Sequence, residues 1–140
     1  MVAFAQELED KRSELYHAND RFVAICARFF EDKNISITPE GTLSIIAKLD
    51  NRPIHWRMLS SGEKQILILL IQALIWSRSP VIYIADEPEL SLHVEWQEML
   101  VDSLIELAGS CQLIIATHSP DITGGRTEAI TKIKPTVKAS

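Results

Sequence analysis

Two acidic side chains and one histidine each follow a short apolar run, a placement that could support phosphate chemistry. Asp86 and Glu87 come directly after the run 81–85, and His118 follows the run 112–116. If these runs are neighbouring parallel strands, their carboxyl ends meet at the sheet edge where ligands bind in open α/β sheets. We therefore expect the three side chains to lie together.

The adjacent carboxylates restrict the chemistry, because two such groups resist desolvation unless a cation or a proton compensates. The most economical assignment puts Asp86 on the water shell of Mg²⁺ and leaves Glu87 to orient and polarise an attacking water. His118 could contact a terminal phosphate or that water. The structural alternative is an acidic loop before a helix, where negative charge is mildly stabilising, beside a histidine that only completes a strand end.

A third polar segment, 59–65, precedes a long apolar stretch and reads Leu-Ser-Ser-Gly-Glu-Lys-Gln. Free backbone N–H groups and the positive end of the helix dipole lie at such a helix start. A phosphate could dock at Ser60 and Gly62, with Ser61 and Glu63 beside them, because a glycine lets backbone approach a ligand closely. The alternative is a capping box, in which Ser60 and Glu63 satisfy backbone N–H groups without any ligand.

The elements that must position these segments are predicted by hydrophobic periodicity. A helix is expected over 2–33, and β-branched runs around Pro-Glu-Gly turn chemistry predict a hairpin, followed by an extended piece at 54–58. An apolar helix over 61–77 comes before the first strand, and an amphipathic helix over 91–108 lies between the two strands. Both strands are short and apolar, as in a parallel pair that is covered on both faces.

We predict one α/β domain, since 140 residues are too few for two ordinary ones. Parallel strands with flanking helices are combined with a small β-hairpin region and an N-terminal helix. The expected divisions are the helix (1–33), the β-hairpin region (34–58), the part with the candidate chemistry (59–125) and a possible edge strand with a tail (126–140).

Composition and charge argue against several classes of protein. The formal net charge of −5 argues against nucleic-acid binding through bulk positive charge. The longest apolar run is shorter than a membrane span, and the acidic start lacks a signal-peptide pattern. Two distant cysteines indicate neither a disulfide framework nor a zinc site. We expect a cytoplasmic protein with no membrane partner.

The segments, in this order, resemble the C-terminal half of an ABC-type ATPase head, over residues 34–123. The stretch 60–65 is similar to the signature motif, 81–87 to the Walker B strand with its catalytic glutamate, 89–93 to the D-loop, and His118 to the switch histidine. The resemblance implies a P-loop NTPase fold, ATP and Mg²⁺ as cofactors, and two heads that pair around the nucleotide.

Three motifs are similar to the soluble branch of this superfamily: Ser-Ser-Gly-Glu-Lys-Gln, Asp-Glu-Pro-Glu-Leu-Ser-Leu-His and Thr-His-Ser-Pro. That branch holds RecF-like and SMC-like DNA-repair ATPases, and the overcoming-lysogenisation-defect and Septu-type or retron-associated ATPases of phage defence. Ser61 and Glu63 replace the usual glycine and glutamine of the signature, and His93 stands where transporters commonly have aspartate. A transporter nucleotide-binding subunit is therefore the less favoured assignment.

The sequence contains no Gly-x-x-x-x-Gly-Lys-Ser/Thr, the Walker A loop that holds nucleotide phosphates. The resemblance therefore implies the C-terminal lobe of a larger ATPase, which should not turn over ATP alone. Its expected partners are an N-terminal Walker A lobe and a second head, the parent being a homodimer. Five acidic residues of 81–108 are expected on, or just before, a solvated helix face: Glu89, Glu95, Glu98, Asp102 and Glu106.

Two functions remain open. In the first, ATP clamps two heads together and hydrolysis releases them, as a dimerising switch in DNA repair or phage defence with DNA or an effector protein as partner. Glu87 then activates water, Asp86 serves Mg²⁺, His118 serves the phosphate, and Ser60 with Gly62 acts across the dimer. In the second, the chain is the non-catalytic interaction lobe of a split or degenerate ATPase and docks a partner through its hairpin and first helix.

Overall fold

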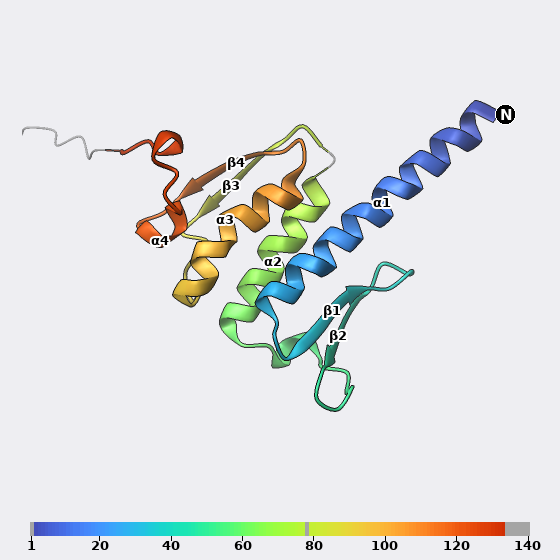
Figure 1. The fold of residues 1–140 in the computed structure, drawn as a ribbon, viewed down its shortest axis with the longest axis horizontal. Coiled ribbons are helices and arrows are strands. Elements are labelled where there is room, and N and C mark those ends of the chain that lie inside the picture. The colour runs from blue at the N-terminus through green and yellow to red at the C-terminus, as the bar shows by residue number, and fades with distance from the viewer. Residues whose placement is uncertain (1, 78, 134–140) are drawn as a thin grey trace, which may run out of the picture.

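A long helix opens the chain, and its second half packs into the body of the molecule. The computed structural model describes residues 2–77 and 79–133. Helix α1 (Val2–Phe29) buries a stripe of Phe22, Ile25 and Phe29 and contacts the helices α2 and α3 described below. Its N-terminal turns project beyond the other elements (Figure 1).

Helix α1 ends at residue 29 rather than at the predicted residue 33, because Lys33 is already paired with Ala47 in the hairpin and the chain must turn before it. Lys48 holds this turn from the hairpin side. Its Nζ donates a hydrogen bond to the Phe30 carbonyl at 3.4 Å, and its backbone N–H donates to the Asp32 carbonyl at 2.9 Å.

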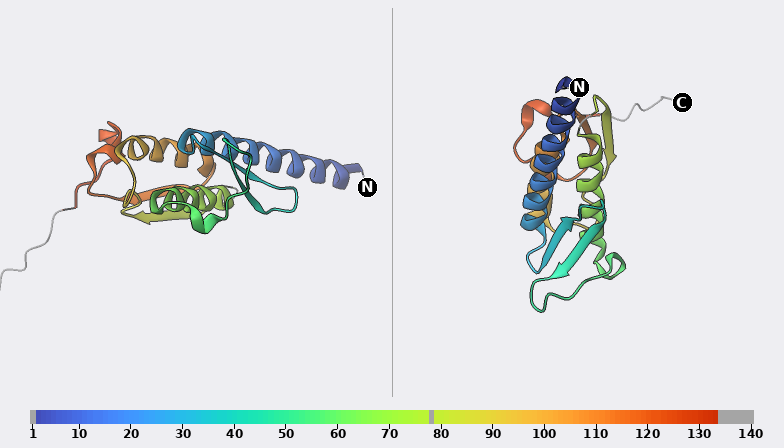
Figure 2. Two further views of the ribbon diagram at one scale, coloured as in Figure 1. Left: turned by 90° about the horizontal axis from the view of Figure 1, so that it is seen from below. Right: turned by 90° about the vertical axis from the view of Figure 1, so that its right-hand side faces the viewer.

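The predicted hairpin is present. Strands β1 (Lys33–Ile37) and β2 (Leu43–Ala47) pair antiparallel, and Ile35 lies opposite Ile45, both buried. The hairpin is separate from the second sheet of the molecule, with α1 and α2 between the two (Figures 1 and 2).

The prediction of extended backbone at 54–58 is wrong. A 3₁₀ helix, η1 (Trp56–Met58), occupies this segment after an isolated bridge between Ile46 and Pro53. The cause is local hydrogen bonding: the His55 Nδ1 atom accepts a hydrogen bond from the Arg57 N–H at 3.2 Å, and such side-chain caps favour a turn over extended backbone.

The second half forms the predicted α/β unit. It consists of α2 (Ser61–Trp76), β3 (Ile82–Asp86), α3 (Val94–Ala108) and β4 (Gln112–Ala116). The two strands are parallel neighbours, so their carboxyl ends lie side by side. Helix α3 covers one face of this sheet (Figure 1).

The expectation that both faces of these strands are covered is wrong for the described residues. Ile82, Ile84 and Ile114 are 59%, 68% and 45% exposed. Ile84 and Ile114 are paired in register, and alternate side chains of a strand share a face, so the three isoleucines form one exposed apolar face. No described element covers it.

The chain after β4 contains a short helix, α4 (Pro120–Thr123), and a 3₁₀ turn, η2 (Thr127–Ala129). The edge strand expected within 126–140 is not formed in 126–133, and 134–140 lie outside the described residues. Among the helices described, none is both long and apolar enough to cross a membrane.

Candidate functional site

Glu87 and His118 lie together at the carboxyl end of the parallel strands. The His118 Nε2 atom is 3.4 Å from the Glu87 Oε1 atom. The pairing of Asp86 with Ala116 brings the two strand ends level, and the Glu87 N–H continues the ladder by donating to the Ala116 carbonyl at 2.8 Å. The His118 side chain is 96% exposed and that of Glu87 26%, so both can meet a ligand from solvent.

The backbone at Glu87 adopts a conformation that non-glycine residues rarely take. Its φ angle is 45°, in the left-handed region, which costs a residue with a side chain on the order of 1–3 kcal/mol. The hydrogen bond from its N–H to β4 holds the backbone there. Local strain of this kind concentrates at ligand and catalytic sites.

Asp86 ends β3 with an exposed side chain that has no hydrogen-bond or ion-pair partner among the described residues. Mg²⁺ retains several waters and needs only one or two protein carboxylates besides phosphate oxygens. An exposed, unpaired carboxylate fits such an ion. The described residues contain no group of three metal-ligating side chains, so any Mg²⁺ here would take most of its ligands from water and nucleotide.

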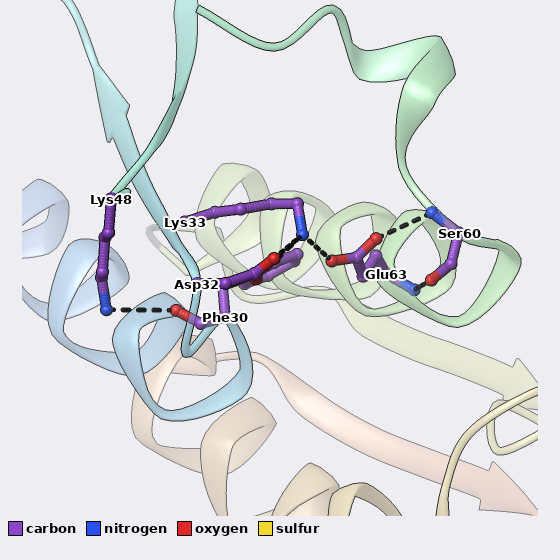
Figure 3. Close-up of polar contacts among 6 residues, drawn as sticks. All are labelled: Phe30, Asp32, Lys33, Lys48, Ser60 and Glu63. Atoms are coloured by element: carbon purple, nitrogen blue, oxygen red, sulfur yellow. Dashed lines mark hydrogen bonds and ion pairs between the residues drawn. The ribbon is translucent and has the colours of Figure 1, made fainter. Parts of the chain in front are cut away.

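Ser60 and Glu63 form the capping box that was one of the two expectations for this segment (Figure 3). The Glu63 N–H donates to the Ser60 Oγ atom at 3.2 Å, and the Ser60 N–H donates to the Glu63 Oε2 atom at 2.7 Å. The cap uses the Ser60 Oγ atom only as an acceptor, which leaves its hydroxyl hydrogen available to a phosphate. Ser61, the first residue of α2, is exposed beside it.

Gly62 is buried, and the backbone of the 88–92 loop packs closely against it. A Cβ atom at this position would lie 2.7 Å from the Ser91 carbonyl oxygen. The approach of the 88–92 loop to α2 is therefore enough to require a glycine at this position, whether or not a ligand also contacts its backbone. The Gln65 amide, one turn later, donates to the Pro88 carbonyl at 3.5 Å and joins the same two segments.

Lys33 contacts the capping box of Ser60 and Glu63, a contact that was not predicted from the sequence. From the start of β1 its Nζ donates to the Glu63 Oε1 atom at 2.7 Å and to Asp32 (Figure 3). Burial alone would raise the pKa of Glu63, but hydrogen bonds from Lys33 and from the Ser60 N–H lower it below its ordinary value. Burial alone would lower the pKa of Lys33, but its hydrogen bonds to Asp32 and Glu63 raise it.

The prediction that Glu89 lies on, or just before, a solvated helix face is wrong. Its side chain is buried, with 6% of the residue exposed. The Oε1 atom accepts hydrogen bonds from the Thr117 hydroxyl and from the Ser119 N–H, the latter at 3.3 Å. These partners flank His118, so a third carboxylate belongs to the neighbourhood of the Glu87–His118 pair.

Comparison with known proteins gives a family and a set of similar structures, two of which are described here. The family model described as AAA ATPase domain matches residues 4–123. No curated protein matches the chain. A structure from a study of ATP-driven dimerization and DNA-stimulated activation of SMC ATPases is 20% identical, with a TM-score of 0.56, and the match covers 82% of this chain and 75% of that one.

An SMC head bound to the C-winged helix domain of ScpA is 23% identical, with a TM-score of 0.58. The match covers 75% of this chain and 35% of that chain, so the matched part corresponds to about a third of that chain. At these identities the likeness shows a shared fold. The α/β fold class predicted from the sequence is confirmed.

Proposed function

The chain belongs to the AAA ATPase domain family, and on this basis we propose that it is the C-terminal lobe of an ABC-type P-loop ATPase head. It supplies the Walker B strand, the signature motif and the switch histidine to a site that binds and hydrolyses ATP. The observation that carries this proposal is the Glu87–His118 pair at the carboxyl ends of β3 and β4.

The pair has the chemistry that hydrolysis requires. The Glu87 carboxylate can accept a hydrogen bond from a water and polarise it for attack on the terminal phosphate. The exposed His118 imidazole can contact that phosphate or exchange a proton at Nε2. Mg²⁺, held through water by Asp86, would neutralise phosphate charge when bound.

The Ser60 segment acts, in this proposal, on the nucleotide of a second head. The capping box fixes the Ser60 Oγ atom at the start of a helix of 16 residues while leaving its hydroxyl hydrogen free. Backbone N–H groups of the first turn, at Ser61 and Gly62, add the positive end of the helix dipole. Contact with a phosphate held by another head would make the dimer depend on ATP.

The Walker A loop must come from outside these 140 residues, in the same or another polypeptide. The exposed apolar face of Ile82, Ile84 and Ile114 supports this arrangement. Isoleucines on a central α/β strand normally pack under a second layer. We assign this face and the adjoining strand edge to the lobe that carries Walker A.

We further propose that the assembled heads act as a dimerising switch in DNA repair or phage defence. The support is the soluble-branch style of the three motifs and the fold shared with SMC heads, of which ATP-driven dimerization and DNA-stimulated activation are described. DNA or an effector protein would then be the partner that the switch controls.

The experiment compares ATP hydrolysis and nucleotide binding in the ATPase that combines this chain with its Walker A lobe. Glu87→Gln should keep nucleotide binding and lower kcat by about 10²–10⁴-fold, the usual contribution of a general base. Glu98→Gln, which neutralises an exposed carboxylate on α3, is the matched control and should leave kcat unchanged. Hydrolysis by Glu87→Gln at the parent rate would overturn the assignment and favour the non-catalytic interaction lobe.

A further inference from the structure

The loop that carries His118 is tied to the segment after β3 on both sides of the histidine. The Thr117 hydroxyl and the Ser119 N–H both donate to the Glu89 Oε1 atom. The Ser119 hydroxyl donates to the Gln97 Oε1 atom at 2.7 Å, and the Gln97 amide donates to the Leu92 carbonyl at 3.0 Å. The chain of contacts joins β4 to the loop and helix that follow Glu87.

The His118 side chain itself has little to hold it. It is 96% exposed, and among the described residues its imidazole has one polar partner, Glu87 at 3.4 Å. Packing therefore cannot fix its direction. Its position depends on the backbone of residues 117–119, and that backbone is anchored through Thr117 and Ser119.

We propose that Glu89 is a positioning residue, whose buried carboxylate holds the 117–119 loop so that the His118 imidazole faces Glu87. The inference deepens the proposed function and rests on it. Glu89 does not touch the reacting atoms; it acts through the histidine. The catalytic roles proposed for Glu87 and His118 do not depend on a role for Glu89.

The burial of Glu89 is hard to explain by packing alone. Its Oε2 atom is buried and has no hydrogen-bond partner among the described residues, and a buried carboxylate without full pairing destabilises a fold. An apolar side chain would fill the same space at lower cost. A carboxylate is useful here because its Oε1 atom accepts from two donors that flank one histidine.

The geometric part of the test uses the chain by itself. The Ser119 N–H is shared between the Glu89 Oε1 atom at 3.3 Å and the Thr117 Oγ1 atom at 2.9 Å, and Glu89 in turn holds the Thr117 hydroxyl. Glu89→Ala should therefore raise the hydrogen-exchange rate of the Ser119 amide by about twofold or more and weaken the NMR contacts between the His118 ring and residue 87. Glu89→Gln retains an accepting oxygen and should preserve both signals, as should Thr117→Ser, while Thr117→Val should weaken them. Unchanged signals in Glu89→Ala would overturn the inference.

The functional part uses the assembled ATPase. Glu89→Ala should lower kcat by roughly tenfold to a hundredfold with little change in KM, because a small misplacement of a reacting group is costly. In a His118→Ala background the same substitution should change kcat by less than about twofold, since the group it positions is gone. Glu89→Gln should restore most of the activity.

The outcomes separate the two proposals. An equal loss from Glu89→Ala with and without His118 would show a merely structural role and overturn the inference. Normal hydrolysis by Glu89→Ala, with loss by His118→Ala, would overturn the inference and leave the proposed function intact. Normal hydrolysis by both His118→Ala and Glu87→Gln would remove the proposed function, and the positioning role with it.

Discussion

The Lys33 Nζ atom lies 2.7 Å from the Glu63 Oε1 atom and joins the start of β1 to the first turn of α2 (Figure 3). Both side chains are largely buried, 13% and 14% exposed. Glu63 at the same time closes the capping box on Ser60. The ion pair therefore couples the hairpin region to the capped start of α2, two parts that are distant in sequence.

Removing this ion pair should destabilise the chain. We expect Lys33→Met to lower the free energy of unfolding at pH 7 by about 1–3 kcal/mol, because the Glu63 carboxylate loses a charged partner. Lys64→Met, on the same turn of α2 but without an ion pair among the described residues, should stay within about 0.5 kcal/mol. Urea unfolding of both variants provides the measurement, and equal stabilities would contradict the prediction.

The same pair predicts the pH dependence of stability. The pKa of Glu63 is lowered in the folded chain from its ordinary value of 4.5, so its contribution is complete above that value and is lost as pH falls through the folded pKa. The pKa of Lys33 is raised from 10.5, so its contribution is lost only as pH rises through a still higher value. The stability difference between wild type and Glu63→Gln should thus be constant at neutral pH and shrink below pH 4.5.

Gly62→Ala should destabilise the junction between α2 and the 88–92 loop. The new Cβ atom would lie 2.7 Å from the Ser91 carbonyl oxygen, a backbone atom that moves only with its loop. Overpacking of this kind costs about 1–3 kcal/mol. Ser61→Ala, at the exposed neighbouring position, is the control. Thermal unfolding that ranks the two variants equally would contradict this packing.

Ser60→Asp separates the capping role of this residue from its proposed contact with phosphate. Aspartate is as good an N-cap as serine, so stability should stay within about 1 kcal/mol, while Ser60→Ala should lose about 1 kcal/mol. The carboxylate removes the donating hydroxyl and repels phosphate. ATP-dependent dimerisation of the assembled heads should therefore be lost in Ser60→Asp, and its persistence would mean that Ser60 only caps the helix.

Ile84→Lys tests the exposed face of the parallel sheet. Since Ile84 is 68% exposed, its replacement should change the stability of this chain by less than about 0.5 kcal/mol. If the Walker A lobe packs there, the variant should weaken its association by at least about tenfold, because a lysine would be buried without a partner. Ile105→Lys, at an exposed isoleucine of α3, is the control. Binding is measured by titration of the lobe.

The sequence predicted the parts of the structure that depend on local pattern. Periodicity located α1, α2, α3 and the two strands, and the convergence of parallel strand ends was enough to bring His118 to Glu87. The capping box could also be predicted, since its two residues are only three positions apart. These features follow from spacing along one short segment or from one rule of α/β sheets.

The missed features depend on contacts between distant segments. Glu89 looked like one more acidic residue before a solvated helix, and its burial arises from Thr117 and Ser119, 28 and 30 residues away. Lys33 is 30 residues from Glu63. The exposed sheet face was missed because an apolar strand has the same sequence whether its cover belongs to the same chain segment or to another.

The most direct test of the Glu87–His118 pair is a single-turnover measurement of ATP cleavage in the assembled ATPase. The variants are Glu87→Gln, His118→Ala and the two together. If both residues act on one water and one phosphate, each single variant should be strongly slowed, and the double variant should be little slower than the slower single one. Cleavage at the parent rate in either single variant, or losses that multiply in the double variant, would contradict a shared hydrolytic pair.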